Sequence, residues 1–131
     1  MNATRRRRLS SLSLALSLAS PALSADAEAP ISARDAGARF GQALGTVEIC
    51  IGSKITSKAS AMEAAYSGAD LDAFKTQAAK VFDAWLKVKA CAKQVDPNQC
   101  KIIMDKSCAA AEAEIGPAGS VAPGLVDFPT R

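Results

Sequence analysis

The chain has 131 residues with 16 Lys or Arg, 13 Asp or Glu and a formal charge of +3. It contains no histidine, which excludes Ser-His-Asp and Cys-His catalytic sites, Cys2His2 zinc, blue copper and c-type haem with a histidine ligand. A chain of this length suits one small domain with a modest core.

Residues 1–25 predict a secretory signal peptide. Four consecutive arginines at positions 5–8 precede a short apolar run, and small residues follow up to Ala25. A basic head, a short apolar centre and a small-residue exit are typical of such leaders, and the run is shorter than the about 20 apolar residues of a membrane span. We therefore expect cleavage before Asp26, a periplasmic or secreted protein, and no stable membrane insertion afterwards. The general export route is favoured over the twin-arginine route, because no cofactor motif follows.

Removal of the leader changes the charge of the working protein. Four of the 16 basic residues and no acidic residue lie in it, which leaves twelve basic against thirteen acidic residues and a charge of −1. The basic patch that nucleic-acid binding requires is then largely lost. The remaining lysines alternate with aspartates, which indicates a solvated helix surface, and we expect no nucleic-acid partner.

A flexible N-terminal segment, residues 26–34, leads into the first predicted helix. Its apolar residues share one face at 100° per residue, and the phase continues past Gly52. The pattern predicts either one helix over residues 35–67, bent at Gly52, or two shorter helices. The residues of this face are Phe40, Leu44, Val47, Ile51, Ile55, Met62 and Tyr66.

Two further helices are expected after a turn at Ser67 and Gly68. Asp70 is placed to cap the second helix, residues 71–95. Asp96 and Pro97 then give the cap and the first position of a third helix, which stops at Gly116. Because short turns force antiparallel neighbours, we expect an all-α fold: an up-down-up three-helix bundle over residues 35–116, followed by an extended Pro/Gly-rich tail, residues 117–131.

Four cysteines in a small exported chain predict two disulfides. In the up-down-up bundle, folding about Asp96 places Cys91 level with Cys100. Folding about Gly68 places Cys50 opposite the region of residue 86, and Cys108 faces the region of residue 84, so these two meet within about 3 Å along the helix axis. We expect the bonds Cys50–Cys108 and Cys91–Cys100. They should strengthen a core that has one Trp, one Tyr and four Phe.

Two segments are candidates for contact with another protein. Gly37, Gly41 and Gly45 lie four residues apart beside the apolar face of the first helix, where they either admit another helix or weaken this one. The tail carries apolar side chains in a segment that cannot form a helix or a central strand, so they are either a contact surface or part of a loose terminus. These tail residues are Val121, Leu125, Val126 and Phe128.

The functional prediction is a non-enzymatic binding protein with no cofactor. It would act as an adaptor, inhibitor or chaperone-like protein on another envelope or extracellular protein. No phosphate-binding loop, G-x-S-x-G or H-E-x-x-H motif occurs in the chain. The alternative is a thiol redox protein or a sulfur-ligand metal carrier, with Cys50, Met62, Met104 and Cys108 as soft ligands. No C-x-x-C supports a redox centre, and methionines at helical spacing are more often core residues.

Overall fold

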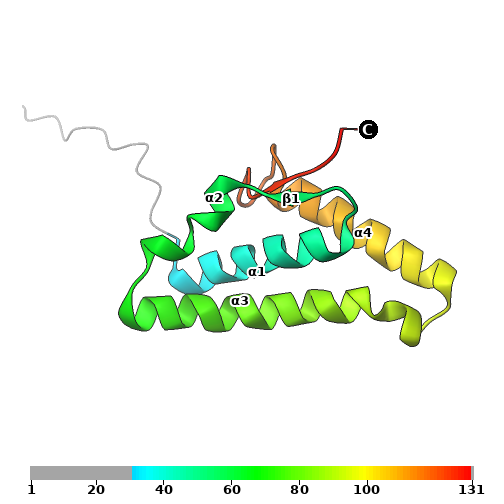
Figure 1. The fold of residues 1–131 in the computed structure, drawn as a ribbon, viewed down its shortest axis with the longest axis horizontal. Helices are drawn as coiled ribbons and strands as arrows, with labels where there is room; N and C mark the ends of the chain where they lie inside the picture. Colours follow the sequence, from blue (N-terminus) through cyan, green and yellow to red (C-terminus); the bar gives the residue numbers. More distant parts are fainter. Residues whose placement is uncertain (1–30, 131) are drawn as a thin grey trace, which may run out of the picture. The chain divides into compact units, whose positions relative to one another are not determined.

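The computed structural model describes residues 31–130, which are mostly helical (Figure 1). The predicted signal peptide and most of the segment that follows it lie outside the described residues. The elements in chain order are α1 (Ala33–Ile49), β1 (Lys54–Ile55), α2 (Ser57–Ser60), the 3-10 turn η1 (Glu63–Ala65), α3 (Gly68–Lys89), the 3-10 turn η2 (Cys91–Lys93), α4 (Pro97–Ile115) and β2 (Val126–Asp127).

Helix α1 begins at Ala33 and ends at Ile49, so the expected helix over residues 35–67 is wrong in its second half. Ser32 caps its start by accepting a hydrogen bond from the Asp35 N–H at 3.1 Å. After Cys50 the chain turns at Gly52, whose φ of 80° is a left-handed conformation that glycine adopts without steric cost. The apolar phase that continues past Gly52 belongs to a crossover segment, residues 50–67, which contains the short α2 and η1 and does not continue α1.

Helices α1 and α3 run parallel, which corrects the expected up-down-up order. At their N-terminal ends the rings of Phe40 and Phe74 lie 5.4 Å apart. At their C-terminal ends the Lys89 ammonium binds the Glu48 carboxylate at 2.7 Å. The crossover segment returns the chain to the start of α1 before α3 begins, and α4 then runs back against their direction (Figure 1).

Glycines on α1 allow the close approach of α3. A Cβ atom on Gly37 would overlap the Phe74 backbone carbonyl, and one on Gly41 would overlap the Ala78 carbonyl. A Cβ on Gly45 would overlap the Trp85 side chain. The three glycines are buried against the chain's own α3, so their prediction as a contact surface for another protein is wrong. Of the two roles weighed for them, admission of another helix is the one that the structure shows.

The starts of α3 and α4 differ in how their caps are made. Ser67 precedes α3 without a side-chain cap, and Asp70 lies in the first turn of the helix, where its charge suits the helix dipole. At α4 the prediction is confirmed, since the Asp96 carboxylate accepts from the N–H groups of Asn98 and Gln99 at 2.9 and 3.0 Å. Helix α4 ends at Ile115, before Gly116, as the sequence indicates.

The tail folds back on the end of α4 and contributes to the core. Leu125 and Val126 are 1% and 0% exposed, so their prediction as a contact surface is wrong, and so is the alternative of a loose terminus for this part. Leu125 donates its N–H to the Ile115 carbonyl at 3.0 Å, and β2 pairs antiparallel with β1 through Val126 and Ile55. The tail has no long strand of its own, and its backbone N–H and C=O groups are instead paired by hydrogen bonds to α4 and the crossover segment.

Two core clusters hold these elements together. One surrounds Phe74 at the start of α1 and α3, with Ala33 and Ala36. The other lies between α1, α4, the crossover segment and the tail, and its buried members are Ala43, Ala59, Ala111, Ile115, Leu125 and Val126. Beside this second cluster, hydrogen bonds connect α1 to α4. Gln42, 7% exposed, donates to the Glu114 carboxylate at 2.6 Å and accepts from Arg39 at 2.8 Å.

Candidate functional site

Both predicted disulfides are present in the structure. Cys50 bonds to Cys108 with their Cα atoms 5.7 Å apart, and Cys91 bonds to Cys100 with 5.4 Å between the Cα atoms. No cysteine is free. The first bond joins the end of α1 to the middle of α4, and the second closes the connection between α3 and α4.

Two adjoining cavities lie between the end of α1 and α4, and we call them together the disulfide cleft. The larger, of about 390 Å³, is lined by Ile49, Ile51, Ala92, Pro97, Cys100, Lys101, Met104 and Asp105. The smaller, of about 260 Å³, is lined by Ile49, Cys50, Ile51, Met104, Asp105, Cys108, Glu112, Phe128, Pro129 and Thr130. Four residues line both cavities, so the two adjoin; the lining is largely apolar in the larger cavity and mixed in the smaller.

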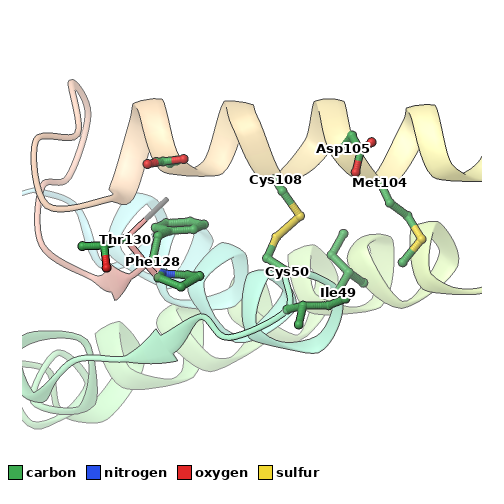
Figure 2. Close-up of a pocket in the computed structure, with 10 residues that line it drawn as sticks. Ile49, Cys50, Met104, Asp105, Cys108, Phe128 and Thr130 are labelled. Carbon is green, nitrogen blue, oxygen red and sulfur yellow. A yellow bond between two sulfur atoms is a disulfide. The ribbon is translucent and has the colours of Figure 1, made fainter.

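The α4 wall of the disulfide cleft follows from helical spacing. Cys100, Met104 and Cys108 recur every four residues and so share one side of the helix. The Met104 sulfur lies 3.9 Å from the Cys100 sulfur. Figure 2 shows Met104 reaching from α4 toward Ile49, with the Cys50–Cys108 bond between Met104 and Phe128. Sulfur atoms of Cys100, Met104 and Cys108 therefore lie along the α4 wall of the cleft.

Ile51 forms the exposed rim of the disulfide cleft. Its neighbour Cys50 is 6% exposed and is bonded to α4, whereas Ile51 itself is 97% exposed. The turn is held by Ser53, whose N–H and hydroxyl both bond to the Cys50 carbonyl, at 3.0 and 2.6 Å. Because Cys50 is directed inward and Gly52 then turns the chain, Ile51 is left projecting into solvent.

Charge at the disulfide cleft is confined to exposed side chains of α4. Lys101 and Asp105 are paired one helical turn apart, with side chains 75% and 65% exposed. An exposed pair of this kind contributes only about 0.3–0.5 kcal/mol to a helix. Glu112, also exposed, lines the smaller cavity. The interior of the cleft is therefore suited to apolar groups, with one cation and two anions at its edge.

The structure separates the residues of the alternative metal site. Met104 lines the disulfide cleft, but Met62 packs against both core clusters. Cys50 and Cys108 are bonded to each other. Within residues 31–130 there is no group of three or more Cys, Asp or Glu side chains arranged to hold a metal ion.

The remaining predicted contact residues take two different places. Phe128 is partly buried and lines the smaller cavity of the disulfide cleft. Val121 is 51% exposed and lies with Ile31 on a separate cavity of about 290 Å³ near the start of α1. Ile51 was predicted for the apolar face of the first helical stretch and Ile49 was not singled out, so neither was expected to line a site. The glycine directly after Cys50 and Ile51 was the available signal, because glycine at such a position can turn the chain.

Comparison of the chain with protein-family models, curated proteins and solved structures found no match. None of the helices in the described part of the chain is both long and apolar enough to span a membrane.

Proposed function

We propose that this protein is exported and acts without catalysis, by holding an apolar side chain of another protein in the disulfide cleft. The observation that carries the proposal is the junction of a 97% exposed Ile51 with an apolar cavity of about 390 Å³. Single exposed apolar residues need no explanation, but an exposed side chain continuous with an apolar cavity is typical of a contact site. Adaptor, inhibitor and chaperone-like roles all use such a contact.

The construction of the disulfide cleft supports a binding role. Its two walls, the end of α1 and the middle of α4, are joined by the Cys50–Cys108 bond. A preformed cleft needs little ordering when a partner binds, and less of the interaction free energy is then lost to conformational entropy. Structural disulfides persist in oxidising compartments, which agrees with the export that the leader predicts.

Site-specific photo-crosslinking in the native cell tests the proposal. A benzophenone amino acid replaces Ile51, and in a matched control it replaces Ile31, which is 51% exposed at the opposite end of α1. Helix α1 has 17 residues, so the two positions are about 25 Å apart at 1.5 Å per residue. We expect a discrete adduct with another exported protein from position 51 and not from position 31.

The crosslinked partner is then identified and its affinity measured. Ile51→Asp should weaken binding at least about tenfold, which corresponds to 1.4 kcal/mol. Its melting temperature should be unchanged, because Ile51 is almost fully exposed. Equal adducts from both positions, or unchanged affinity of the Ile51→Asp variant, would contradict the proposed function.

A further inference from the structure

The face that carries the disulfide cleft contains both halves of an apolar contact. Ile51 projects from the rim, and the cavity beside it is lined by apolar and sulfur-containing side chains such as Ile49, Cys100 and Met104. In a contact with twofold symmetry, the same surface of each copy faces the other. If group i of one copy touches group j of the other, then j of the first copy also touches i of the second. A face with a projecting side chain beside a cavity can form such a contact with a copy of itself, because the projection of each copy can enter the cavity of the other.

The charges at the edge of the larger cavity have the same self-complementary arrangement. Lys101 and Asp105 are the two charged residues that line it, and they lie one turn apart on α4. A twofold axis that crosses α4 midway between them sets the two copies of α4 antiparallel. Lys101 of each copy then lies opposite Asp105 of the other, and no like charges face each other.

The salt bridge between Lys101 and Asp105 within one copy would have to break for the two residues to pair between copies, and breaking it costs little. The bridge between Lys101 and Asp105 within one helix is largely exposed to water, so its loss costs less than about 0.5 kcal/mol. Between two copies the same charges would be partly desolvated, and attraction between opposite charges increases when water is removed.

We propose that a second copy of this chain covers the disulfide cleft in a twofold dimer, with Ile51 of each copy in the cavity of the other. This inference rests on the proposed function, because it takes the disulfide cleft to be a protein-binding face. The dimer shields the apolar face until the partner competes for it, so binding of the partner and dimerisation exclude each other.

The mass of the exported, disulfide-bonded protein in solution tests this proposal. Sedimentation velocity over a range from micromolar to hundreds of micromolar should show the wild type change from monomer to dimer. Ile51→Asp should remain a monomer throughout, because the substitution places a carboxylate in an apolar cavity. Ile31→Asp, the matched control at the other end of α1, should dimerise like the wild type.

A charge exchange tests the orientation of the two copies. Lys101→Glu should weaken the dimer at least about tenfold, or 1.4 kcal/mol, because two carboxylates then face each other in both halves. The double variant Lys101→Glu with Asp105→Lys restores opposite charges and should dimerise like the wild type. Failure of the double variant to recover, or equal loss of the dimer in Ile31→Asp and Ile51→Asp, would overturn the proposed contact.

The failure of the dimer and the failure of the proposed function are distinguishable. A wild type that is monomeric at every concentration overturns the dimer, while an adduct with another exported protein would still support the function. Conversely, if position 51 gives only an adduct of twice the chain's mass, the dimer is supported and the heterologous partner is wrong.

Discussion

Gly41 lies at a close approach of the backbones of α1 and α3, where the absence of a side chain is favourable although glycine disfavours the helix itself. In an isolated helix glycine is less favourable than alanine by about 1 kcal/mol. Here a Cβ atom would overlap the backbone carbonyl of Ala78, which cannot move without displacing α3. Packing and helix propensity therefore predict opposite signs for the same substitution.

We expect Gly41→Ala to lower the free energy of unfolding by about 1–3 kcal/mol, because overfilling a close contact outweighs the gain in propensity. Chemical denaturation measures the change. Ala79→Gly, at an exposed position of α3, calibrates the propensity contribution in the same protein. A stabilised Gly41→Ala variant would show that α1 and α3 do not pack through this glycine.

Leu125 shows at the same scale that the tail belongs to the core. It is 1% exposed and packs in the cluster that contains Ala111 and Ile115. Leu125→Ala should lower the free energy of unfolding by about 2–5 kcal/mol, as expected for loss of a buried leucine. Val121→Ala, at a tail position that is 51% exposed, should change it by less than about 0.5 kcal/mol. Equal effects of the two substitutions, measured by thermal melting, would mean that the tail is not packed in solution.

At the scale of elements, the two disulfides that attach α4 are expected to contribute differently to the free energy of unfolding. The Cys50–Cys108 bond spans 58 residues of sequence, and the Cys91–Cys100 bond spans 9. On the chain-entropy model, a longer closed loop removes more freedom from the unfolded chain, giving about 4 and about 2.5 kcal/mol respectively.

Replacement of Cys50 and Cys108 together by alanine should therefore lower stability by about 1.5 kcal/mol more than replacement of Cys91 and Cys100. In a domain of this size such a difference is readily measured by thermal melting. The wild type, purified without reductant, should contain no free thiol. Loss of equal or greater stability in the Cys91/Cys100 variant would show that loop length does not determine the contribution of these bonds.

At the scale of the whole molecule, the parallel course of α1 and α3 is the feature most open to a direct test. In the structure Phe40 and Phe74 are in ring contact. In an up-down-up bundle folded about Gly68, Phe40 would instead lie near residue 96, beyond the end of α3. Nuclear Overhauser cross-peaks between the ring protons of Phe40 and Phe74 should therefore be present. Their absence in the folded protein would contradict the parallel arrangement.

The correct disulfide pairing does not by itself establish the helix order. Folding back about Gly68 places Cys50 opposite residue 86. In the parallel register Gly37 lies opposite Phe74 and Gly41 opposite Ala78, and extension of this register places Cys50 beside residue 87. The two arrangements coincide at the C-terminal end of α1 and differ most at its N-terminal end. The pairing was therefore predicted correctly from an arrangement that the structure corrects.

The sequence by itself determined the features that depend on residues close together in the chain. The cap at Asp96, Pro97 in the first turn of α4 and the stop before Gly116 are local, because each involves hydrogen bonds within about one helical turn. The Cys91–Cys100 bond is local in the same sense, since its residues lie on either side of one turn. Helical composition and the approximate extents of α3 and α4 followed from the same short-range pattern.

Only the tertiary structure decided the direction of α1 relative to α3, the burial of the tail and the position of the disulfide cleft. Ile55 and Met62 keep the apolar phase of α1, yet they pack against the core from the crossover segment, because periodicity records burial and not backbone conformation. Leu125 and Val126 are buried only because Ile115 and β1 supply partners for their backbone. Ile51 becomes exposed because its neighbour Cys50 is bonded to Cys108 of α4, 58 residues further along the chain. Each of these outcomes depends on contacts between distant segments, which a pattern of neighbouring residues does not contain.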